Sequence, residues 1–272
     1  MLAPVASRPI DIADALIATP FAPARGLGGV EGAVANVGTN TVAHLGGELA
    51  FRHTGTSGAN YTALGSPVPA VVNCWVLVVR FRVDALGVTT TIANTSNQTT
   101  GASAYVLHLR VSTTGALQFA ARDSATRFVT PAGTIQAGRW YTCAVRMGRF
   151  PTEQAGNSSM RGWLDGVQVG AFVTSASSVT EQTGEVAVAG GKHLSATDGQ
   201  NCAVSFAAFL PQSAPDDVCA ALSADPWLLL YPDDVPVFYS AGGGPVAPTL
   251  SMPTVVDIGT TSARPRVTLD FA

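Results

Sequence analysis

Paired carboxylates are the first side chains to consider for chemistry in this 272-residue chain, because glycoside hydrolysis uses two of them at a fixed separation. Glu181 and Glu185 are four residues apart, so strand alternation would place both carboxylates on one face. The stretch around them is loop-like, however, and no Asp lies between them. We therefore predict no catalytic residue here, and we expect that the chain is not an enzyme.

The histidines and cysteines lack the spacing of a metal or redox site. No His-x-x-x-His and no Cys-x-x-Cys pair occurs among His44, His53, His108, His193, Cys74, Cys143, Cys202 and Cys219. No phosphate-binding loop or Gly-x-Ser-x-Gly motif is present either. The sequence thus predicts no metal and no cofactor. We expect the cysteines to be buried free thiols, and His108 to be a surface or inter-subunit residue.

Charge and hydropathy argue against nucleic-acid and membrane partners. Charged residues make up 12% of the chain, the net charge is −3, and the Arg side chains are scattered, with Lys192 as the single lysine. No basic stripe is therefore available to neutralise phosphates. No apolar run approaches the roughly 20 residues that span a bilayer. Asp11 and Asp14 stand where a signal peptide would be apolar, so we expect no secretory signal.

The elements that must position any site are strands. From Cys74 to Asp84 apolar residues alternate with a face that carries Arg80 and Arg82, which predicts a strand with one core face. Similar alternation over 105–111 and 117–121 predicts a hairpin, and Asp165-Gly166 between two further runs predicts a second hairpin. One short helix is expected over Asp216–Leu222. Many short strands at this spacing predict an all-β, two-sheet antiparallel jelly-roll sandwich.

The composition changes near both ends of this β-rich region. Residues 1–40 contain several prolines and glycines and predict an irregular N-terminal arm, in which residues 10–17 form either a short helix or part of an extended arm. The sandwich is expected over residues 41–235. Residues 236–272 begin with a Gly-rich linker and end in a β tail, with a hairpin predicted from 255–258 and 266–271.

Residues 138–146 and 163–170, which include Trp140, Trp163 and the Asp165-Gly166 turn, resemble the concanavalin A-like, laminin-G-type jelly roll. The order and spacing of motifs match from about residue 48 to 224. Hydrolases of this fold carry a Glu-x-Asp-x-x-Glu triplet that this sequence lacks. The resemblance leaves two alternatives open for Trp140 and Trp163, core packing or a sugar-stacking platform. In some relatives, acidic residues near the position of Asp165 bind calcium. In this sequence the Asp-Gly turn is enough to explain why position 165 is Asp, so we predict no calcium site there.

A second resemblance concerns the stretch from Leu222 to Pro232, with Asp225-Pro226-Trp227, and the segment 256–269. Both are similar to segments of tailed-bacteriophage and prophage structural proteins. The resemblance implies a structural virion component, either a head decoration protein or a tail or fibre subunit, located in the virion and assembled in the host cytoplasm. Expected partners are other copies of the chain and other virion proteins. A carbohydrate-binding module for host-surface glycans is the alternative, and a glycan-degrading enzyme is the third hypothesis.

Overall fold

The computed structural model describes residues 15–20, 35–37, 41–53, 61–65, 74–96, 105–121, 126–148, 158–175, 186–189 and 201–230. All of them belong to one compact unit, Arg8–Tyr231. The rest of the chain lies outside the described residues, and so do the predicted C-terminal hairpin, Glu181, Glu185 and His193. The domain boundaries at residues 40 and 235 therefore stay predictions.

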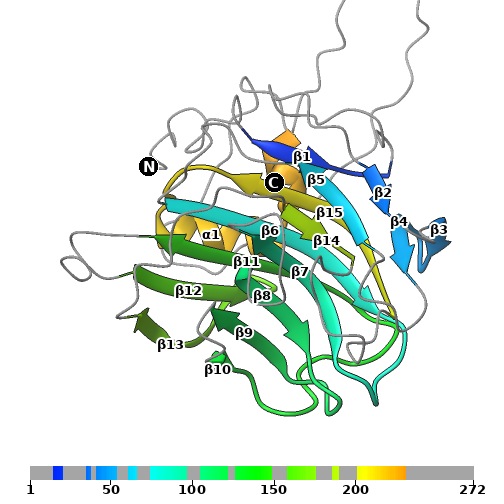
Figure 1. The fold of residues 1–272 in the computed structure, drawn as a ribbon, viewed down its shortest axis with the longest axis horizontal. Helices are drawn as coiled ribbons and strands as arrows, with labels where there is room; N and C mark the ends of the chain where they lie inside the picture. The colour runs from blue at the N-terminus through cyan, green and yellow to red at the C-terminus, as the bar shows by residue number, and fades with distance from the viewer. Residues whose placement is uncertain are drawn as a thin grey trace, which may run out of the picture. The chain divides into compact units, whose positions relative to one another are not determined.

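The described strands form two antiparallel sheets, which confirms the predicted two-sheet sandwich (Figure 1). Sheet A has eight described strands. Seven form a path in the order β13 (Val167–Ser175), β12 (Ser158–Leu164), β11 (Trp140–Gly148), β6 (Cys74–Val83), β15 (Cys202–Leu210), β4 (Glu48–His53), β3 (Thr41–Leu45), and β1 (Leu16–Ala18) pairs with β15 beside this path. Sheet B has seven described strands in the order β10 (Thr126–Val129), β9 (Leu117–Ala121), β8 (Tyr105–Val111), β7 (Thr90–Ser96), β14 (Val186–Val188), β5 (Tyr61–Gly65), β2 (Ala35–Val37).

The core lies between the sheets and follows the period-two pattern. Trp75, Phe81 and the apolar residues between them at alternate positions of β6 are fully buried in it. Facing them from sheet B are Leu107, Leu109 and Phe119. Because each such side chain contributes about 1.5–3 kcal/mol when it leaves water, the alternation decides which face of each strand turns inward.

Two tight turns need residues that tolerate positive φ. At the β12–β13 turn Asp165 has φ 47° and Gly166 has φ 84°, as predicted for an Asp-Gly hairpin. At the β3–β4 turn Gly46 and Gly47 have φ 56° and 87°. This second hairpin lies at the start of the predicted sandwich and adds β3 to the edge of sheet A.

The outer face of sheet A is partly covered by the helix α1 (Asp216–Ala224) and the 3-10 helix η1 (Pro226–Leu230). Cys219, Leu222 and Leu229 pack there against apolar side chains of the sheet. Asp216 at the start of α1 pairs with Arg146 at 3.0 Å and accepts a hydrogen bond from Arg161, which fixes the helix on β11 and β12. The predicted short helix is confirmed. None of the described helices is long and apolar enough to cross a membrane.

Two described strands, β1 (Leu16–Ala18) and β2 (Ala35–Val37), lie within the segment predicted to be irregular. β1 (Leu16–Ala18) pairs with residues 207–209 of β15, whereas β4 pairs with residues 202–204 of the same strand. Two short strands thus share one edge of β15. Residues 16 and 17 form a strand and not the short helix that was one alternative, because pairing with β15 buries Leu16 and Ile17 almost completely.

Candidate functional site

Beyond α1 and η1, the outer face of sheet A is polar, and strand register decides which side chains meet there. In one row, Arg52 of β4 is opposite Ala203 of β15, Ala203 is opposite Arg82 of β6, and Arg82 is opposite Trp140 of β11. In the neighbouring row, Arg80 is opposite Thr142. We call this surface the polar face and define it by Glu48, Arg52, Arg80, Arg82, Asp84, Trp140, Thr142 and Ser205.

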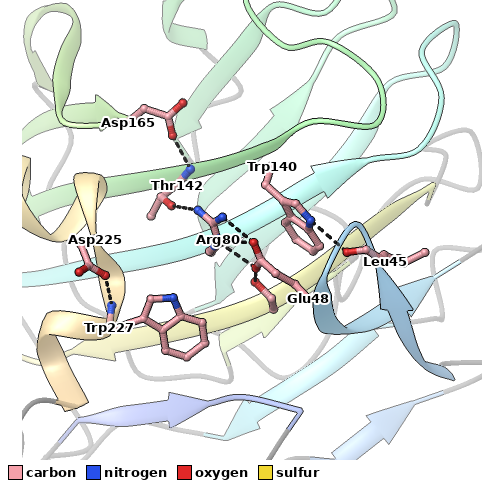
Figure 2. Close-up of polar contacts among 9 residues, drawn as sticks. Leu45, Glu48, Arg80, Trp140, Thr142, Asp165, Asp225 and Trp227 are labelled. Atoms are coloured by element: carbon pink, nitrogen blue, oxygen red, sulfur yellow. Dashed lines mark hydrogen bonds and ion pairs between the residues drawn. The ribbon is translucent and has the colours of Figure 1, made fainter. Parts of the chain in front are cut away.

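Glu48 and Arg80 form the centre of the polar face (Figure 2). The Arg80 Nε donates to both oxygens of the Glu48 carboxylate at 3.0 and 2.9 Å, and Arg80 Nη2 lies 2.5 Å from Oε1. The Ser205 hydroxyl donates to Glu48 Oε2 at 2.6 Å. Burial by itself would raise the pKa of Glu48, but the Arg80 and Ser205 hydrogen bonds and the Arg80 charge outweigh it, and the pKa is lowered.

Asp84 is shared by two arginines at the end of β6. Arg52 Nε donates to Asp84 Oδ2 at 2.9 Å, and Arg82 Nε lies 3.3 Å from Oδ1 without forming a hydrogen bond. The side chains of Arg52, Arg82 and Asp84 expose 36%, 21% and 16% of their surface, so the cluster is partly open to solvent. Its charges are therefore only partly screened by water.

Trp140 borders the polar face at the start of β11. Its Nε1 donates to the Leu45 carbonyl at 3.2 Å, which ties the indole to the β3–β4 turn. The Arg80 guanidinium carbon lies 5.8 Å from the Trp140 ring centroid, within cation–π distance. The side chain is half-buried, so part of this aromatic surface stays accessible.

Trp227 of η1 lies near the opposite border. Its ring packs edge-on against Phe206 at 5.1 Å, and Phe206 is the register partner of Arg80 across β15 and β6. The Asp225 carboxylate accepts a hydrogen bond from the Trp227 backbone N–H at 3.0 Å and fixes the start of η1. In Figure 2 the two indoles lie on either side of the Glu48–Arg80 pair.

Taken together, the polar face combines planar aromatic surface with guanidinium donors and carboxylate acceptors on a rigid sheet. Guanidinium and carboxylate groups offer paired donors and acceptors in fixed planes, which suits a ligand rich in hydroxyl groups. Among the described residues no group of three or more His, Cys, Asp or Glu side chains could hold a metal ion. The chemistry offered here is therefore polar recognition beside an aromatic ring.

The structure separates the two tryptophans for which packing and stacking were alternatives. Trp163 exposes 2% of its surface and belongs to the apolar cluster beneath α1, so its role is packing. Trp140, in contrast, belongs to the polar face. Asp165 lies at its turn, where its Oδ1 accepts a hydrogen bond from the Thr142 backbone N–H at 2.8 Å.

The buried histidines and thiols have structural roles. His108 was expected at the surface, but it exposes 3%, and its Nε2 lies 2.8 Å from the Thr91 hydroxyl. The expected surface position was wrong, because the ring is buried beside Thr91 of the neighbouring strand β7. Cys143, Cys202 and Cys219 are buried without a disulfide, as predicted, whereas Cys74 is half-buried.

Sequence reasoning did not assign the polar face. Its one visible signal was the placement of Arg80 and Arg82 on the polar side of the best-defined strand. Glu48, Arg52 and Ser205 carry no local signal, because they reach the site through strands that are distant in the sequence. Glu181 and Glu185, the only pair weighed for catalysis, lie outside the described residues.

No protein-family model and no curated protein matches the sequence. Among solved structures, the chain is similar to a Trypanosoma rangeli sialidase in complex with 2,3-difluoro-KDN, with a TM-score of 0.50 and 12% identity over 71% of this chain and 29% of that chain. It is also similar to a Ruminococcus gnavus IT-sialidase CBM40 bound to α2,3-sialyllactose, with a TM-score of 0.43 and 12% identity over 57% and 85%.

At these identities the likeness shows the fold alone, and it is consistent with a concanavalin A-like fold. The match spans less than a third of the sialidase chain, so the activity of that whole protein does not transfer to this one. The comparison nevertheless corrects one expectation. The absence of a carboxylate triplet led us to expect that the chain is not an enzyme, and that expectation is contradicted, because solved enzymes share its fold.

Proposed function

We propose that the polar face binds carbohydrate. The observation that carries this proposal is Trp140, a half-buried indole held by Leu45 directly beside the Glu48–Arg80 pair. A sugar ring presents an apolar C–H face and a rim of hydroxyl groups. Aromatic surface can cover the first, and the charged side chains can bond the second.

Rigidity supports the same proposal. Each side chain of the polar face stands on a strand of sheet A, or directly after one, and Glu48 is held by both Arg80 and Ser205. Preorganised groups lose little conformational entropy when a ligand binds. The fold likeness to a sialidase solved with a sugar-derived ligand agrees with the proposal at the level of fold.

The test is a glycan array followed by calorimetry with the full chain, its Trp140→Ala variant and a matched control. Val167→Ser is the control, because Val167 is 66% exposed on β13, away from the polar face. We expect Trp140→Ala to weaken binding about tenfold or more, as for an aromatic hot spot, and Val167→Ser to bind like the original chain. Binding that survives Trp140→Ala, or no binding to any glycan, would overturn the proposal.

A second proposal concerns the setting in which the chain works. The motif around Asp225-Pro226-Trp227 supports a structural role in a bacteriophage virion, with other virion proteins and other copies of the chain as partners. A fibre or decoration subunit that binds host-surface glycans would combine both proposals. Mass spectrometry of purified particles tests this role, and absence of the chain from them would contradict it.

A further inference from the structure

We infer that the glycan bound at the polar face carries a carboxylate, and that the Arg82 guanidinium receives it. This inference rests on the proposed function and adds the substrate class. It starts from an arginine whose hydrogen-bonding capacity is unused. In the described part of the chain Arg82 donates no hydrogen bond; its buried Nε lies 3.3 Å from Asp84 Oδ1 as an ion-pair contact, without hydrogen-bond geometry.

An unused guanidinium is unusual at this depth. Arg82 exposes 21% of its side chain, and a guanidinium has five N–H donors that are normally bonded when they are shielded from water. Neighbouring arginines show the normal pattern, since Arg80 is bonded to Glu48 and Thr142. Arg82 makes no hydrogen bond to another described residue, so the terminal nitrogens of this partly exposed guanidinium are available to an acceptor from a ligand.

The charge balance indicates that this acceptor is an anion. The Glu48 carboxylate is occupied by Arg80 and Ser205. The Asp84 carboxylate is hydrogen-bonded by Arg52, yet it is also the ion-pair partner of Arg82. One carboxylate thus serves two guanidinium groups, and a ligand carboxylate would complete the balance beside Arg82.

The Arg82 guanidinium packs against two turn glycines, next to the proposed stacking ring of Trp140. A Cβ at Gly46 would lie 3.0 Å from Arg82 Nη1 and 3.3 Å from Trp140 Nε1, and a Cβ at Gly138 would lie 3.8 Å from Nη2. Both glycines have positive φ, 56° and 80°, so side chains are disfavoured there. These close contacts hold the planar guanidinium beside Trp140, and its 21% exposed surface is the part that a ligand carboxylate can reach while the sugar ring contacts Trp140.

The experiment compares matched acidic and neutral probes by calorimetry with the full chain. The pairs are α2,3-sialyllactose with lactose, and hyaluronan with chitin oligosaccharides. The variants are Arg82→Gln and Arg82→Lys, and Arg110→Gln is the control. Arg110 lies on sheet B, where it bonds Gln118 at 2.8 Å, so its replacement removes the same charge elsewhere.

We expect the original chain to prefer the acidic member of at least one pair, and Arg82→Gln to weaken that probe about tenfold or more. Arg82→Lys keeps the charge but loses the planar fork, so its loss should be smaller but measurable. Arg110→Gln should leave the affinity unchanged. If the loss in Arg82→Gln came only from the change in net charge, Arg110→Gln would lower the affinity by the same factor.

Three outcomes overturn the inference. These are equal affinity for acidic and neutral probes, unchanged affinity in Arg82→Gln, and an equal loss in Arg110→Gln. The inference and the proposed function fail differently. If neutral glycans bind, and this binding is lost in Trp140→Ala but not in Arg82→Gln, the proposed function stands and the inference about a ligand carboxylate fails. If no probe binds, both fail.

Discussion

Arg80 and Glu48 form an ion pair across an intervening strand, since Arg80 lies on β6, Glu48 lies on β4, and β15 runs between them. The contact is possible because β15 places the small side chain of Ser205 beneath it, at a register shift between Val204 and Phe206. The pair therefore ties three strands together on the polar face. Such a bridge can be tested by its effect on stability.

Replacing Glu48 by Gln should lower the free energy of unfolding by about 1–3 kcal/mol, because Arg80 then loses its counter-charge. The measurement is urea unfolding of the Glu48→Gln and Arg80→Gln single variants and of the double variant. We expect the two losses to be non-additive by about 1 kcal/mol or more, since the residues are in contact. Additive losses would show that the pair contributes little to stability.

The β12–β13 turn makes a prediction about Asp165, which combines positive φ with a side-chain hydrogen bond to Thr142. Asp165→Asn should be nearly neutral, because Asn tolerates the same φ and can accept the same bond. Asp165→Ala should cost about 1–3 kcal/mol, since it loses both advantages.

Asp165→Gly separates the two contributions to the turn, because it keeps the backbone freedom and loses only the hydrogen bond. Thermal unfolding of the three variants should rank them Asn, Gly, Ala in decreasing stability. An Ala variant as stable as the original chain would contradict the assigned role of Asp165.

His53 predicts a pH dependence of folding. It is fully buried, its two ring nitrogens have no hydrogen-bond partner among the described residues, and burial lowers its pKa from 6.5 to about 3. Burial, with a smaller contribution from Arg110, also lowers the pKa of His108 to about 3. Below pH 6.5 the unfolded chain binds protons that the folded chain rejects, so stability falls as the pH falls toward 3.

The slope should reach about 1.4 kcal/mol per pH unit for each such histidine. The test is urea unfolding between neutral and acidic pH for His53→Leu, with His44→Gln as the control at an exposed histidine. We expect His53→Leu to be at least as stable at neutral pH and to depend less on pH, because an unbonded polar ring is removed. An unchanged slope would argue against a buried neutral His53.

Thiol reactivity tests the packing of the sandwich interior. Cys143 and Cys202 are fully buried, and burial raises the pKa of both thiols; it also raises the pKa of Cys219 to about 12. Because the thiolate is the reactive form, we expect an alkylating reagent to modify Cys74 in the native state and all four cysteines after unfolding. Native labelling of Cys202, read by peptide mass spectrometry, would contradict the core described above.

Much of the fold could be predicted from local patterns. The alternation through β6, the hairpin at Asp165-Gly166 and the helix after β15 were all visible in the sequence, because each depends on neighbouring residues. β1, β3 and β5 were not predicted. These strands are short or weakly patterned, and their pairing with partners distant in the sequence stabilises them.

The candidate site was less predictable than the fold. Trp140 was singled out with a stacking platform as one alternative, but no residue was assigned to a site, and the carboxylates weighed for catalysis were Glu181 and Glu185. Glu48 joins Arg80 from 32 positions away, and no local pattern reports such a distance. Sequence spacing alone also led to the contradicted expectation about enzymatic activity.

By itself, the sequence determined which face of each well-patterned strand turns inward, because side-chain alternation is a property of the strand alone. It also determined the Asp165-Gly166 turn through the φ values those residues tolerate. Only the tertiary structure decided that Glu48, Arg80, Arg82 and Trp140 share one surface, because strand order and register place them there. The same pairing placed Arg82, which makes no hydrogen bond to another described residue, beside Trp140, and this placement carries the inference about a carboxylated ligand.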